Sequence, residues 1–400
     1  MLSGLLAGYR SFFALPDVTR LVAMAMVARM PLGTHGLALL LHVRALTDSF
    51  ATAGSAVGTY LAASAVTAPV VGRIVDRIGP RKPLLVMGIA CPVALVFVLA
   101  ARPLHLTPPL ILLFAGVGGA FAPPITVLTR TMWRYRFEDD GIARRTAFAV
   151  DAVLVELAFT LGPALIALLV AVAGATTAYA AAVIFTALAV PVFFASPALR
   201  YWKHESGIER HLLGPLTAPR LLLVYLLCAL LTFCLGLLEV AYPAFAAALG
   251  ATALSGVLLA VNSTGSALGG LAYGGSHIAM PVERQLRALL VLLGLSLGVQ
   301  AFVSSAWLLG VLAFVGGLFI APSLTAVTLL VSANAPARYA TEAFTWAATC
   351  IVAGVGAGMA VGGNLVEASG ASGVFAAAGW SALVAAACAL GLRAHEPRVQ

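Results

Sequence analysis

The chain has 400 residues, of which 62% are hydrophobic and 10% are charged, and its formal net charge is +8. A water-soluble domain usually carries about 25% charged residues. With a mean hydropathy of +1.03, this chain cannot cover itself with polar groups, so we expect lipid to surround most of it. Helices satisfy their own backbone hydrogen bonds in lipid, which predicts an all-α membrane protein.

Twelve apolar stretches are long enough to cross a bilayer as helices, which takes about 20 residues each. The boundary between the ninth and the tenth stretch is marked only by residues 304–306. In chain order the predicted spans are 20–43, 51–73, 83–101, 108–130, 146–172, 177–196, 220–246, 252–273, 286–304, 306–331, 341–366 and 372–393.

The positive charges lie mainly on one side of these spans. With a cytoplasmic N-terminus, 20 of the 23 Lys and Arg fall in inner loops, Arg44 and Arg102 fall in outer loops, and Arg29 lies inside a helix. Positive residues stay on the cytoplasmic side during insertion, so both termini are expected there. The net charge then reflects topology and anionic lipid headgroups, and no nucleic-acid partner is expected.

The first 20 residues lack the basic start, the apolar core and the cleavage site of a signal peptide. We interpret them as a cytoplasmic lead-in to the first helix. Arginine greatly outnumbers lysine and alanine is abundant, which indicates a GC-rich bacterial genome. The expected location is therefore the bacterial cytoplasmic membrane.

The sequence also contains an internal repeat. GVGGAFAP at 116–123 recurs as FVGGLFIAP at 314–322, and Gly162 recurs at Gly358. Two copies in the same orientation predict two pseudo-symmetric six-helix bundles joined by the most polar long stretch of the chain. The predicted first bundle, cytoplasmic linker and second bundle are 1–199, 200–219 and 220–400.

A charged loop, GRIVDRIGPRKPLL at 72–85, separates the second and third predicted spans. It resembles the conserved loop Gly-x-x-x-Asp-Arg-x-Gly-Arg-Arg/Lys of the major facilitator superfamily, with Pro80 inserted before the basic pair. The alternative is a basic run that serves topology alone, which would need neither the aspartate nor the glycines. The residues that match the pattern are Gly72, Asp76, Arg77, Gly79, Arg81 and Lys82.

With twelve spans and a two-fold repeat, the resemblance covers the whole chain. It implies a secondary transporter whose two halves rock around a central binding site, with the loop acting as a cytoplasmic gate. We expect Gly72 to let the second helix approach a neighbour closely. In the fifth span, Gly162 and Pro163 resemble part of the family's antiporter signature, which favours export. Alternatively, this pair only bends the helix.

Charged residues at membrane depth are costly and mark candidate functional sites. Arg29 and Glu156 lie about 14 and 15 Å from the inner face at 1.5 Å per residue. We therefore expect them to form a buried pair, either for substrate binding and proton coupling or as a permanent structural ion pair. Asp151 lies nearer the inner face, where we expect it to pair with an arginine such as Arg130 or Arg134.

Three further residues are candidates for the transport path. Glu239, near the outer end of the seventh span, is a candidate proton-accessible carboxylate or outer-gate contact; alternatively it only reaches the membrane interface. Asn262 and Trp346 are candidate cavity contacts or, alternatively, packing residues. The five cysteines lie in apolar spans without metal-ligand spacing, so no metal or cofactor is expected.

No phosphate-binding loop or catalytic constellation is found in the sequence, so neither an ATP-driven pump nor an enzyme is expected. We expect a secondary active transporter, a monomer, that exports a small organic molecule in exchange for protons by alternating access. Arg29 as the single buried cation indicates an amphiphilic or anionic substrate. The alternatives are proton-coupled uptake of a sugar, organic acid or similar metabolite, and a membrane sensor or scaffold.

Overall fold

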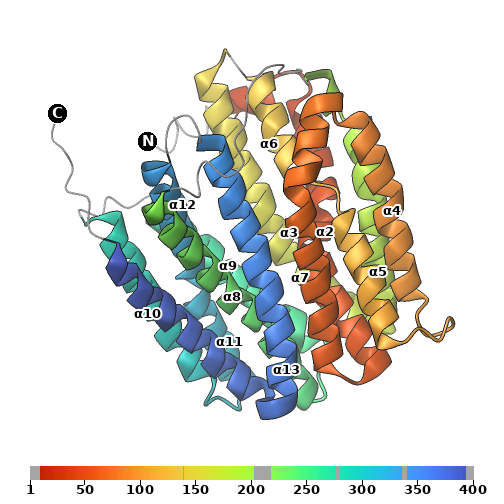
Figure 1. Cartoon of the computed structure of the whole chain (residues 1–400), viewed down its shortest axis with the longest axis vertical. Coiled ribbons are helices and arrows are strands. Elements are labelled where there is room, and N and C mark those ends of the chain that lie inside the picture. Colours follow the sequence, from red (N-terminus) through yellow and green to blue (C-terminus); the bar gives the residue numbers. More distant parts are fainter. Residues whose placement is uncertain (1–9, 138, 202–217, 275–279, 336–339, 393–400) are drawn as a thin grey trace.

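The computed structural model describes residues 10–137, 139–201, 218–274, 280–335 and 340–392 (Figure 1). Within these ranges the regular structure is helical and contains no strand. The helices of the first half are α2 (Val18–Thr47), α3 (Phe50–Ile78), α4 (Arg81–Leu99), α5 (Pro108–Ala120), α6 (Ile125–Arg136) and α7 (Gly141–Ala195). Those of the second half are α8 (Pro219–Ala248), α9 (Leu254–Gly274), α10 (Val282–Gln300), α11 (Ala306–Gly317), α12 (Ile320–Asn334) and α13 (Ala340–Cys388).

Nine helical stretches in the described part of the chain are long and apolar enough to cross a membrane. Two of them, in α7 and α13, contain a glycine with a positive φ, 83° at Gly174 and 66° at Gly370. Figure 1 shows α13 turning back at this point. If α7 and α13 supply two passages each and the 19-residue α10 adds one, the nine stretches accommodate the twelve predicted passages.

The fourth and tenth predicted spans each consist of two helices, which the sequence analysis missed. Residues 121–124 separate α5 from α6, and residues 318–319 separate α11 from α12. The first break contains Pro123 and Pro124, which lack the backbone N–H that a continuous helix needs. The predicted boundary between the ninth and tenth spans is confirmed, since α10 ends at Gln300 and α11 begins at Ala306.

The internal repeat is visible in how the helices cross. A methyl group added at Gly119 of α5 would overlap the carbonyl oxygen of Tyr60 in α3. At the repeated position, a methyl group at Gly317 of α11 would overlap the carbonyl oxygen of Asn262 in α9. The repeated double glycines therefore mark the same close helix contact in both halves, as small residues do inside membranes.

A second crossing follows the same rule. Gly162 of α7 packs directly against the backbone of Gly33 in α2, and Gly358 of α13 packs directly against Gly236 in α8. Each half therefore joins its first helix to its fifth passage through a pair of glycines. The linker predicted between the halves falls mostly outside the described residues.

We name the two ends of the helical bundle by their connections. At the linker end lie Gly79, Arg136, Tyr201 and Pro219. At the far end lie Gly174, Gly370 and the turns at 48–49, 100–107, 249–253 and 301–305.

The two halves meet along α3 and α13 and along α7 and α9. Toward the far end, a methyl group at Gly54 would overlap the carbonyl oxygen of Met359, and one at Gly256 would overlap that of Pro163. The far end is therefore closed by backbone contact on both sides of the molecule.

Candidate functional site

A buried ion-pair cluster joins three helices of the first half. The Arg29 guanidinium of α2 donates to one carboxylate oxygen of Asp151 in α7. The Nε of Arg130 in α6 donates to the other oxygen over 2.9 Å. The Arg29 and Asp151 side chains are 0% and 1% exposed, whereas that of Arg130 is 54% exposed. Asp151 therefore connects a fully buried cation to one that reaches the surface.

This cluster gives Arg29 a partner that the sequence analysis did not assign to it. The structure pairs Arg29 with Asp151, whereas the sequence analysis expected Glu156, whose side chain lies outside the described residues. Helical side chains lean toward the N-terminus of their helix. Because α2 begins at the linker end, the guanidinium of Arg29 lies nearer that end than its own backbone. The predicted contact between Asp151 and Arg130 is confirmed.

Glu239 differs from Asp151 in its surroundings. It lies on α8 and is half-buried, and no hydrogen bond or ion pair to another described residue is found for its carboxylate. One turn further on, Tyr242 donates to Gln300 over 3.0 Å, so the neighbouring polar group is satisfied within the second half. Glu239 is therefore a carboxylate at membrane depth for which the described residues supply no hydrogen-bond or ion-pair partner.

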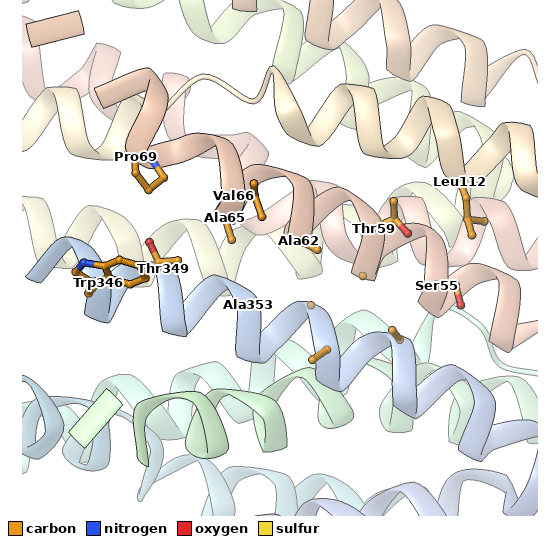
Figure 2. Close-up of a pocket in the computed structure, with 14 residues that line it drawn as sticks. Ser55, Thr59, Ala62, Ala65, Val66, Pro69, Leu112, Trp346, Thr349 and Ala353 are labelled. Carbon is orange, nitrogen blue, oxygen red and sulfur yellow. The ribbon is translucent and has the colours of Figure 1, made fainter. Parts of the chain in front are cut away.

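A cavity of about 690 Å³ lies between α3 and α13, with a contribution from α5 (Figure 2). It extends from Ser55 and Ala360, next to the contacts that close the far end, to Pro69 and Trp346 toward the linker end. Pockets of this size suit small organic molecules. Because the two walls belong to different halves, a molecule bound here would contact both.

The structure separates the two predicted cavity contacts. Trp346 lines the cavity between α3 and α13. Asn262 does not line it; its side-chain amide donates to the carbonyl of Ala313 over 2.8 Å and so ties α9 to α11. This contact fits the alternative that Asn262 is a packing residue. Its backbone carbonyl also lies at the close helix contact with Gly317 that repeats in both halves.

The charged loop between α3 and α4 is placed only in part. Gly79 ends α3 with φ 80°, a conformation that favours glycine. A methyl group at Gly72 would meet nothing within 4 Å, so the predicted close helix approach at this residue is absent here. Arg81 and Lys82 are exposed, and the side chains of Asp76 and Arg77 lie outside the described residues.

The motif of the fifth passage has a packing role. Gly162 lies at the crossing with α2, and the carbonyl of Pro163 lies against Gly256 of α9 in the other half. The non-helical residue of α7 is Gly174, so the helix continues through Gly162 and Pro163. Gly162 thus allows close helix packing within the first half, and Pro163 contributes to the contact between the two halves.

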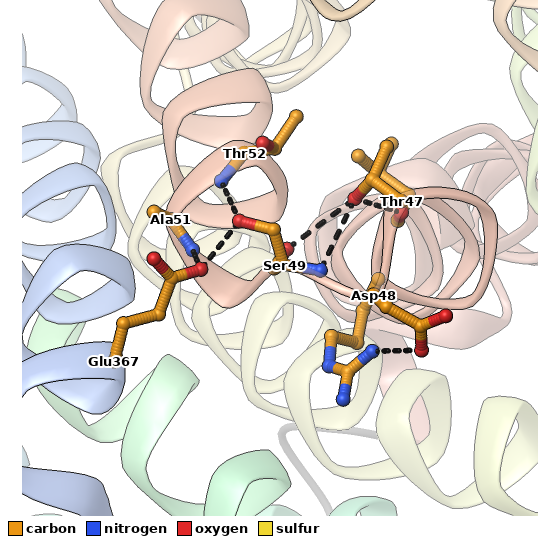
Figure 3. A network of polar contacts seen from close by, with 8 residues as sticks. Thr47, Asp48, Ser49, Ala51, Thr52 and Glu367 are labelled. Atoms are coloured by element: carbon orange, nitrogen blue, oxygen red, sulfur yellow. Dashed lines mark hydrogen bonds and ion pairs between the residues drawn. The ribbon is translucent and has the colours of Figure 1, made fainter.

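Glu367 connects the halves at the far end (Figure 3). Its carboxylate accepts a hydrogen bond from the hydroxyl of Ser49 and another from the backbone N–H of Ala51, over 3.0 Å for the latter. The Ser49 hydroxyl in turn accepts from the N–H of Thr52. A residue of α13 therefore satisfies a backbone donor in the first turn of α3, where anions are favoured.

We expect Glu367→Ala to favour opening of the far end, because it removes both hydrogen bonds of this contact. The expected result is a severalfold larger population with a long distance between spin labels at residues 48 and 369, on the order of one lost helix cap. Pulsed electron–electron double resonance on purified protein gives the distribution of distances between the two labels and so measures this population. The matched control is Asn364→Ala, because the Asn364 amide donates to the carbonyl of Ala360 in its own helix. An equal change in both variants would contradict the prediction.

The described residues contain no cluster of three or more metal-binding side chains. Residues 21–299 match the sequence profile of the Major Facilitator Superfamily. The comparison with curated proteins gave no match.

Two crystal structures of the nucleoside transporter NupG are similar in fold. The structure of a NupG mutant has a TM-score of 0.77 at 15% identity over 93% of this chain and 98% of that chain. A second NupG structure has a TM-score of 0.72 at 15% identity over 94% and 99% of the two chains.

Proposed function

The chain belongs to the Major Facilitator Superfamily, and from this premise we propose that it exports a small organic molecule in exchange for protons. A member of this family is a multi-pass membrane transporter and not an enzyme. The observation that carries the proposal is the cavity between α3 and α13, which lies between two halves that touch toward the far end. Such an arrangement suits rocking of the halves around a bound molecule.

In this proposal the linker end faces the cytoplasm of a bacterial cell. The support is the positive-inside bias, since loops at the linker end carry most Lys and Arg. Both termini then lie in the cytoplasm, and the protein works as a monomer in the cytoplasmic membrane. The closed far end makes the described conformation inward-facing.

Glu239 is the carboxylate that we propose for proton coupling. Asp151 is held by two guanidinium groups, so we assign it a structural role. Glu239 lacks such a partner among the described residues, and an unpaired charge at membrane depth is costly. Of these two carboxylates, Glu239 is therefore the one that we propose to take up the proton on one side of the membrane and release it on the other. Glu156 remains a second candidate.

We expect Glu239→Gln to abolish proton movement that depends on substrate while leaving the protein folded. Reconstituted vesicles with an internal pH dye measure this movement when candidate compounds are added. Asp48→Asn is the matched control, since Asp48 is a surface carboxylate paired with Arg44. Undiminished proton movement in Glu239→Gln would remove Glu239 from the mechanism and transfer the test to Glu156→Gln.

Uptake is the second candidate function. It is favoured by the fold similarity to structures described as a nucleoside transporter, although the identity of 15% supports only the fold. Drug resistance on expression in a sensitive bacterium would support export. Growth of a transport-deficient strain on a single nutrient would support uptake.

A further inference from the structure

We infer that the cavity between α3 and α13 binds an uncharged, ring-containing organic molecule, held by the hydroxyl groups of α3 and by Trp346. This inference rests on the proposed transport function and names its substrate class. It also replaces the expectation, drawn from Arg29, that the substrate is anionic or amphiphilic.

The lining of the cavity offers no charged group to pair with a charged ligand. All fourteen residues that line it are uncharged, and most of them are aliphatic residues or glycine. Arg29 does not line it, and the Arg29 guanidinium is already paired with Asp151. An ion that entered would lose part of its water shell without gaining a counter-charge from the lining.

Two hydroxyl groups on α3 lack the partner that such groups usually have in a helix. Thr67, on the same helix, donates to the carbonyl four residues earlier over 2.9 Å. Ser55 and Thr59, one turn apart on the cavity side of α3, make no hydrogen bond to another described residue (Figure 2). They are therefore available to donate to an acceptor on a bound molecule.

The opposite wall on α13 offers different chemistry. The Thr349 hydroxyl donates to the carbonyl of Thr345 over 3.1 Å, so its oxygen remains able to accept from a ligand. Next to it, Trp346 presents an indole ring against which a planar ring stacks favourably. The rest of this wall consists of small residues such as Ala353 and Gly356, and Gly356 also packs against Gly58 and Leu61 of α3 where the two helices touch. An uncharged ring that carries a hydrogen-bond acceptor for the hydroxyl groups of α3 and a donor for the Thr349 oxygen of α13 fits both walls of the cavity.

Three probes on one ring system test the charge preference. Radiolabelled tryptophol is neutral near neutral pH, indole-3-acetate is an anion and tryptamine is a cation. Equilibrium dialysis against purified full-length protein should show tryptophol binding at least roughly tenfold more tightly than either ion, as expected for an unpaired charge in an apolar site. Equal or tighter binding of an ion, or no binding of tryptophol up to millimolar concentration, would overturn the inference.

Variants test the contacts. Thr59→Val and Ser55→Ala should each weaken tryptophol binding about two- to tenfold, the usual effect of one hydrogen bond, and Trp346→Ala should weaken it further. Thr67→Val is the control, since that hydroxyl is satisfied within α3 and does not line the cavity. Equal weakening by Thr67→Val and Thr59→Val would contradict the assigned contacts.

The inference and the proposed function fail in different ways. Selective binding of tryptophol without its movement into or out of vesicles would refute transport of this probe and leave the site intact. Transport in vesicles with no preference for the neutral probe would support the function and overturn the inferred substrate class.

Discussion

Replacing Asp151 with asparagine is expected to destabilise the first half by about 3–5 kcal/mol, the usual cost of removing one partner of a buried ion pair. The reason is Arg29, whose side chain is 0% exposed and would keep its charge without a carboxylate beside it. Thermal unfolding of the purified protein in detergent measures the effect, and loss of a monodisperse folded fraction is the expected result.

Two further variants separate the buried pair from its exposed member. The double variant Arg29→Met/Asp151→Leu removes both charges and should recover much of the stability, because apolar residues often replace a buried ion pair without loss. Arg130→Ala should cost at most about 1 kcal/mol, since that side chain is 54% exposed. An Asp151→Asn protein as stable as wild type would contradict the role of the pair.

The same double variant tests whether these charges take part in transport. A folded Arg29→Met/Asp151→Leu protein that still moves substrate and protons would show that the pair is structural. A folded but inactive double variant would show that Arg29 or Asp151 also acts in coupling, contrary to the assignment of that role to Glu239. The sequence alone left open whether a buried pair at Arg29 is structural or takes part in substrate binding and proton coupling.

Features that repeat along the chain could be predicted from the sequence. The long apolar stretches predicted the membrane-spanning helices, because a helix needs a minimum number of apolar residues to cross a bilayer. The recurrence of Gly162 at Gly358 correctly indicated two similar halves, and both glycines lie at equivalent helix crossings. The charged loop at 72–85 correctly indicated the family, which the match over residues 21–299 shows.

Contacts that depend on where side chains point could not be predicted in the same way. Counting the rise along each helix placed Arg29 level with Glu156 but ignored the lean of the long side chain toward the linker end. The contact of Glu367 with Ser49 joins residues 318 positions apart that no pattern connects. The predicted approach at Gly72 is replaced by close contacts at Gly54 because this conformation closes the far end.

Replacing Gly54 with valine is expected to reduce transport strongly while both halves remain folded. A side chain at this position would overlap the carbonyl oxygen of Met359, which belongs to the other half. Overpacking against backbone costs about 1–3 kcal/mol, so closure of the far end should become roughly ten- to a hundredfold less populated. Transport into or out of vesicles should fall by a similar factor, because alternating access requires that closure.

Two other glycine variants show why the effect depends on which half the neighbour belongs to. Gly33→Val would overlap the carbonyl oxygen of Ala158 within the first half, so it should prevent folding instead of trapping one conformation. Gly36→Val meets nothing within 4 Å and should leave transport unchanged. For Gly54→Val, spin labels at residues 48 and 369 should report a longer distance in a folded protein. An unchanged short distance with normal transport would mean that the far end closes without the Gly54 contact.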